Sequence, residues 1–97
     1  MFQNKRYMTR GFQDTIPLDL QLTIFQLIDE LKTKSKMDYL QVFELEAESK
    51  YIQKLEHRME EPTYKKKYRF AFTKPITAKI FVIDDGNQTT FLLAEEY

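Results

Sequence analysis

The chain has 97 residues, no cysteine, and 15 acidic against 15 basic side chains. This length predicts a single domain over residues 1–97 with one modest core. The lack of cysteine excludes disulfide bonds and thiolate metal sites, and the balanced charge gives no whole-molecule attraction for nucleic acid. No segment has the apolar run of a signal peptide or membrane span, so we expect a soluble, cytoplasmic protein with no membrane contact.

The first third of the chain predicts a short strand and then a long helix. Residues Arg6–Thr9 favour a brief strand that pairs with a later edge of a sheet. Asp14 or Thr15 then precedes Ile16-Pro17, which is typical of a helix cap followed by proline in the first turn. From Pro17 to about Lys34 the apolar residues recur at helical spacing, which predicts an amphipathic helix.

The apolar side of this helix is wider than packing on one sheet requires. It consists of Leu18, Leu20, Leu22, Ile24, Phe25, Leu27, Ile28 and Leu31. Either neighbouring segments cover the whole arc, or one side stays free for contact with a second copy or another protein. We name Leu18, Leu22 and Phe25 the helix flank and treat it as a candidate interaction surface.

The remaining segments favour antiparallel strands. YLQVFELEAE places Phe43 and Leu45 on one side, and a polar connection is expected over residues 46–50. Residues 51–61 fit helical or alternating spacing, and the strand that follows favours a strand here too. AKIFVI, in which we expect Phe81 to fill the core, is joined to TTFLLA by Asp85-Gly86, a strong hairpin signal.

These elements predict an α+β fold: one amphipathic helix packed on an antiparallel meander of four to five strands. A single sheet with one helix on it, or a sheet curled towards a small barrel, would both fit this pattern.

The segment Tyr64–Phe72 combines positive charge with aromatic rings. Its alternation places Tyr68 and Phe70 on one side, and Lys65, Lys67 and Arg69, which we name the basic row, on the other. Proteins that bind single-stranded nucleic acid present rings and cations on the same face, whereas this alternation separates them. The basic row therefore fits three roles: a solvated strand face that prevents edge pairing, a contact for an acidic protein, or a contact for phosphates.

Further motifs are spread along the chain: RYMTRGF, IPLDLQ, DYLQVFEL, KIFVIDDG, FLLAEEY, and the spaced set Gln53, His57, Glu61, Pro62 and Tyr64. Through them the chain resembles, over nearly its full length, a family of short proteins from low-GC Gram-positive bacteria (Firmicutes), catalogued as domain of unknown function 960. The resemblance implies no activity or ligand, and it gives the spaced set no role. From its position alone, we interpret His57 as a hydrogen-bonded strand residue near a sheet surface.

Catalytic and metal-binding patterns find little support. The two serines lie in polar stretches, and Gly11 and Gly86 form no phosphate-binding loop or nucleophile elbow. His57 with Glu60, Glu61, Asp84 or Asp85 has no recognised ligand spacing. We therefore expect no enzymatic activity, no cofactor and no metal.

The function that the sequence favours is a small, non-enzymatic interaction or regulatory module that acts by protein–protein contact. Its partner is an unidentified protein, or a second copy bound through the helix flank. The alternative is a weak accessory nucleic-acid binder that acts through the basic strand Tyr64–Phe72.

Overall fold

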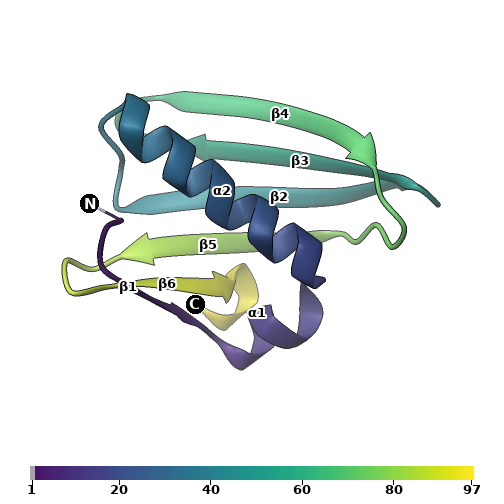
Figure 1. Ribbon diagram of the computed structural model, residues 1–97, viewed down its shortest axis with the longest axis horizontal. Helices are drawn as coiled ribbons and strands as arrows, with labels where there is room; N and C mark the ends of the chain where they lie inside the picture. Colours follow the sequence, from purple (N-terminus) through teal and green to yellow (C-terminus); the bar gives the residue numbers. More distant parts are fainter. Residues whose placement is uncertain (1) are drawn as a thin grey trace.

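The computed structural model describes residues 2–97 and shows one main helix lying across one face of a six-stranded sheet (Figure 1). The strands are β1 (Lys5–Met8), β2 (Leu40–Ser49), β3 (Ile52–Met59), β4 (Tyr64–Ala71), β5 (Ala78–Asp84) and β6 (Gln88–Leu93). The helices are α1 (Arg10–Thr15) and α2 (Leu18–Lys34), and a 3-10 turn, η1 (Ala94–Glu96), follows β6. The α+β class is confirmed, with more strands than expected.

The start of the helical region differs from the prediction. Thr9 is the cap residue, because its Oγ1 accepts the backbone N–H of Phe12 at 3.1 Å and begins α1 directly after β1. Asp14 and Thr15, the expected cap residues, lie inside α1 or at its end, and α2 begins at Leu18 after Pro17. The extra helix brings Phe12 into the core, where it is 0% exposed.

The sheet is not the simple meander that was predicted. Its strand order is β1-β6-β5-β2-β3-β4, and only the β1–β6 pair is parallel. The chain runs through β2, β3 and β4 as consecutive hairpins, and then returns so that β5 pairs with β2, which makes a Greek key. The sheet is open, with β1 and β4 at its edges, and it does not form the barrel that we kept as an alternative.

One buried glutamine holds the connection between β4 and β5 in place. Gln53 of β3 is 0% exposed, and its Nε2 donates to the carbonyl oxygens of Glu46 (3.1 Å) and Ile76 (3.0 Å). Its Oε1 accepts the backbone N–H of Ile76 at 2.9 Å. Because Ile76 lies in the connection and Glu46 in β2, this amide fixes the returning chain against the β2–β3 hairpin.

The structure changes one prediction about the β2–β3 hairpin and confirms one about the β5–β6 hairpin. β2 runs on to Ser49, so the polar connection expected over residues 46–50 is mostly strand. The Asp85-Gly86 turn is confirmed: Gly86 has φ +95°, and the carboxylate of Asp85 accepts the backbone N–H groups of Asn87 and Gln88, each at 2.9 Å.

The two faces of the sheet differ in what covers them. We call the side against α2 the helix face and the other side the open face; no α-helix of residues 2–97 covers the open face. The helix face and α2 share a core made of side chains that are at most 1% exposed: Leu20, Ile24, Ile28, Phe43, Leu55, Ile80, Val82 and Phe91. No helix within residues 2–97 is long and apolar enough to cross a membrane.

Phe81 lies on the open face, so the expectation that it fills the core is wrong. It is only partly buried, and its ring meets the ring of Tyr97 edge-on at 5.7 Å between centroids. Its neighbours Ile80 and Val82 occupy the core instead. Both alternating sets of AKIFVI contain large apolar residues, so alternation alone could not tell the two faces apart.

Candidate functional site

The basic row lies on the open face of β4, as its alternation predicted. Lys65, Lys67 and Arg69 are all exposed, and in the β3–β4 register they stand opposite Arg58, Glu56 and Lys54. The rings of Tyr68 and Phe70 project to the helix face and pack against the core. No aromatic side chain of β4 therefore shares a face with the basic row.

Acidic side chains already face part of the basic row. The guanidinium of Arg69 donates to Glu48 through Nε (2.9 Å and 3.0 Å) and Nη2 (2.6 Å), which is a bidentate pair. This contact holds the pKa of Glu48 below its ordinary value. Lys67 Nζ lies 4.0 Å from Glu56. The row is thus part of a mixed-charge surface, and its use by nucleic acid stays a prediction.

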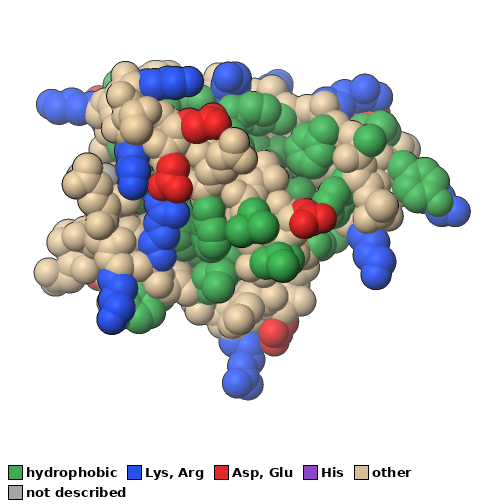
Figure 2. All heavy atoms as spheres, in the orientation of Figure 1, with side chains coloured by type: hydrophobic (Ala, Val, Ile, Leu, Met, Phe, Trp, Pro, Cys, Tyr) green, Lys and Arg blue, Asp and Glu red, His purple; other side chains and the backbone are tan. Residues whose placement is uncertain are grey.

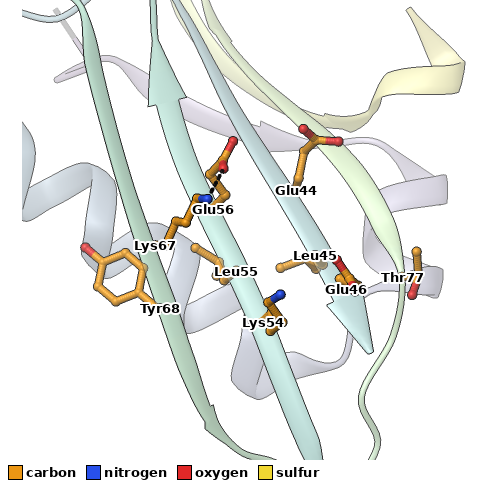
Figure 3. Close-up of a pocket in the computed structure, with 9 residues that line it drawn as sticks. All are labelled: Glu44, Leu45, Glu46, Lys54, Leu55, Glu56, Lys67, Tyr68 and Thr77. Carbon is orange, nitrogen blue, oxygen red and sulfur yellow. Dashed lines mark ion pairs between the residues drawn. The ribbon is translucent and has the colours of Figure 1, made fainter. Parts of the chain in front are cut away.

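A shallow hollow of about 410 Å³ lies beside the row on the open face (Figure 3). It is lined by Glu44, Leu45, Glu46, Lys54, Leu55, Glu56, Lys67, Tyr68 and Thr77. Glu44 and Glu56 stand directly opposite each other in the β2–β3 register, which by itself is unfavourable. Arg58 resolves this repulsion, because its Nη1 donates to both carboxylates, to Glu56 at 3.0 Å. Glu44, Glu56, Arg58 and Lys67 thus form a connected set of ion pairs at the border of the hollow.

His57 is a hydrogen-bonded strand residue, as predicted, but it lies in the core and not near a sheet surface. It is 1% exposed, and its ring stacks on Phe43 with centroids 4.2 Å apart while Tyr64 meets it edge-on at 5.3 Å. Gln41 supplies its polar partner: Nε2 of His57 is 2.8 Å from Oε1 of Gln41. Burial lowers the pKa of His57 to about 4, so the ring is neutral at physiological pH.

The acidic residues considered as metal ligands do not gather around His57. Asp84 is on β5, two strands away from β3, and its carboxylate accepts the backbone N–H groups of Phe2 and Gly86. Across residues 2–97 there is no group of three or more His, Asp or Glu side chains arranged to hold a metal ion.

Two of the three residues of the helix flank are exposed. Leu18 is 66% exposed and Leu22 is 53% exposed, whereas Phe25 is partly buried with its ring edge-on to Phe91 at 4.6 Å. Arg6 of β1 lies over the Phe25 ring at 5.7 Å. Figure 2 shows hydrophobic side chains gathered on this face of the molecule, around the middle of the view where α2 runs.

Comparison with known proteins places the chain in a family. The sequence pattern of the family described as "Staphylococcal protein of unknown function (DUF960)" matches residues 5–96. The chain belongs to this family. A crystal structure of a protein of unknown function from Enterococcus faecalis resembles this DUF960 protein with a TM-score of 0.81 and 25% sequence identity, over 97% of this chain and 91% of that chain. No curated protein matches the sequence.

The spaced set of this DUF960 protein does not converge on one site. Gln53 fixes the β4–β5 connection, while His57 and Tyr64 meet in the core near the other end of β3. Glu61 and Pro62 are exposed in the β3–β4 turn, joined by a cis peptide bond.

Sequence reasoning missed Gln41 and Asp38, which connect the set to the rest of the fold. Gln41 is 0% exposed, and its Nε2 donates to the carbonyl of Asp38 at 2.9 Å, while the Asp38 carboxylate accepts the N–H of Glu61 at 3.2 Å. The available signal was a glutamine two residues before Phe43, on the otherwise apolar side of the strand, because a polar residue there needs a buried partner.

Proposed function

We propose that this DUF960 protein is a non-enzymatic interaction module that binds a protein partner through the helix flank. The observation that carries the proposal is the exposure of Leu18 and Leu22, at 66% and 53%, on a helix whose remaining large aliphatic residues are buried or partly buried. Complete burial of one leucine contributes roughly 1.5–3 kcal/mol, so a partner that covers both would gain a substantial part of its binding free energy there.

The geometry of the flank supports a binding role. Leu18, Leu22 and Phe25 follow one another at helical spacing and therefore lie along one stripe of α2. Phe25 anchors the stripe, because it packs on Phe91 in the core, and Met8 of β1, 38% exposed, projects to the same side of the sheet as Phe91. A rigid apolar stripe loses little conformational entropy when a partner binds.

The position of His57 supports a non-enzymatic role. The chain's single histidine is 1% exposed and neutral, so it is out of reach of a substrate in solution. At the hollow on the open face, Glu44 and Glu56 are both paired with Arg58, and Lys67 lies 4.0 Å from Glu56, so these two carboxylates already have cationic partners.

The test compares Leu22→Glu with Tyr51→Glu. Tyr51, at 56% exposure, matches Leu22 at 53%, but it lies at the β2–β3 hairpin, so both variants place the same charge on an exposed apolar position. Sedimentation velocity over a concentration series measures self-association, and affinity capture from an extract of the producing cells measures binding of another protein. We expect one of these signals from the wild-type and Tyr51→Glu proteins and its loss in Leu22→Glu.

A wild-type protein that stays monomeric and retains the same proteins as Leu22→Glu would overturn the proposal. Because both positions are more than half exposed, neither variant should unfold, and circular dichroism checks this.

A further inference from the structure

β4 forms the long edge of the sheet. Its eight residues pair with β3 on one side, and no strand within residues 2–97 pairs with its other side (Figure 1). In an antiparallel strand every second residue directs its N–H and C=O away from its neighbour, so the outer side of β4 presents a row of unpaired donors and acceptors. The opposite edge, β1, has only four residues. β4 is therefore the edge with room for an added strand.

The charge on this edge is positive and partly uncompensated. β4 carries Lys65, Lys66, Lys67 and Arg69 and no acidic residue. Lys65 stands opposite Arg58, and Lys66 stands opposite the neutral His57. Among the described residues neither lysine has a carboxylate within 4.0 Å, unlike Lys67 and Arg69. Figure 2 shows Lys and Arg side chains along the upper border of the molecule, where β4 runs in Figure 1.

The two sides of β4 would offer different contacts to an added strand. Lys65 and Lys67 project to the open face, where they would contact acidic side chains of the added strand. On the helix face Lys66 lies over the ring of Tyr68, with Nζ 5.4 Å from the centroid, and Tyr68 and Phe70 are partly buried. Apolar side chains of the added strand would pack against Tyr68 and Phe70 at the border of the core.

We infer that β4 is a docking edge for an extended acidic segment of another protein, which adds to the sheet as an outer strand. The fitting segment alternates Glu or Asp, facing Lys65 and Lys67, with apolar residues, facing Tyr68 and Phe70. A second copy of this chain is a poor occupant, because pairing two β4 strands would set lysines against lysines and arginines. The surface is separate from the helix flank, so either proposal can fail without the other.

The experiment titrates ¹⁵N-labelled protein with the synthetic peptide TEVEVEVT at about 10 mM salt, where the Debye length is about 30 Å. We expect the largest amide shifts in β4, slower amide exchange along its outer side, and weaker binding at about 150 mM salt. The double variant Lys65→Glu/Lys67→Glu, which reverses the two charges that face the acidic side chains, should raise the Kd at least about tenfold. Lys34→Glu/Lys36→Glu, the same charge change on two exposed residues at the end of α2 and just after it, should leave the Kd unchanged.

Three further ligands make the result decisive. The basic peptide TKVKVKVT should not bind, and a TEVEVEVT peptide with N-methylated backbone amides should lose binding because it cannot pair with the edge. Equal binding of the methylated peptide would show charge attraction without strand addition and would overturn the inference. So would shifts centred outside β4, or binding of a single-stranded oligothymidylate at β4 when the acidic peptide does not bind.

Discussion

The two faces of β3 place polar side chains on one strand under opposite conditions. On the helix face Gln53 and His57 are at most 1% exposed, and each is held by hydrogen bonds to particular partners. On the open face Lys54, Glu56 and Arg58 remain in contact with solvent, and Glu56 and Arg58 pair with each other. The comparison teaches that burial, more than the number of polar contacts, sets the cost of losing a side chain, because a buried group loses water that its partner must replace.

The largest expected effect compares one substitution on the two faces. Phe43→Ala removes a ring that is 0% exposed and stacks on His57, so the free energy of unfolding should fall by about 3–5 kcal/mol. Phe81→Ala removes a partly buried ring on the open face, and the loss should be about 1 kcal/mol. Urea denaturation measures both. Equal losses would mean that the open face is covered in solution.

The pH dependence of stability tests the buried histidine. The pKa of His57 is about 4 in the fold, against 6.5 for an ordinary histidine, so below pH 6.5 the unfolded chain binds a proton that the folded chain does not. The contribution of the neutral ring to the free energy of unfolding is fully present above pH 6.5. As the pH falls below 6.5, this contribution decreases by about 1.4 kcal/mol per pH unit, about 3 kcal/mol in total by pH 4. Urea denaturation between pH 7.5 and 4.5 should show this decrease.

The matched variant is His57→Gln, which removes the only histidine and should remove the decrease between pH 6.5 and 5. NMR of the single imidazole gives a second measurement that does not depend on the variant folding. The cationic Lys66, which stands opposite His57 in β4, also disfavours protonation of the ring. A ring that titrates near pH 6.5 in the folded protein would therefore contradict the buried, neutral state.

The smallest effect is expected at the Arg69–Glu48 pair. Arg69→Gln removes a bidentate but exposed contact, so the midpoint of denaturation should not change measurably. The pKa of the Glu48 carboxyl, which Arg69 lowers, should return towards its ordinary value in a carboxyl NMR titration. A clear loss of stability in this variant would contradict the expectation that exposed polar contacts contribute less to stability than buried ones.

Periodicity allowed much of the fold to be predicted from the sequence. The apolar spacing of Pro17–Lys34 identified α2, and the alternation of Tyr64–Phe72 correctly separated the basic row from Tyr68 and Phe70. These patterns are local, and they are readable because one side of each element is buried. Leu18 and Leu22 are exposed and Phe25 is partly buried, so neighbouring segments cover only part of the wide apolar arc, and its use for contact stays a prediction.

The features that could not be predicted depend on residues far apart in the sequence. The Greek key requires the short connection after β4 to cross two strands, roughly 14 Å from β4 to β5, and Gln53 holds it there. His57 could be placed in the core only with its partner Gln41, which lies on a different strand. The face of Phe81 was undetermined because AKIFVI is apolar on both sides.

The parallel pairing of β1 with β6 sets an order in which the protein can be completed. Within residues 2–97 β1 comes before every other strand, yet its partner in the sheet is β6, which comes after all the others. Until β6 emerges from the ribosome, Phe12 and Phe25 lack Phe91, and the apolar strand β5 has an unpaired edge. A variant truncated before β6 should therefore be prone to aggregation and proteolysis.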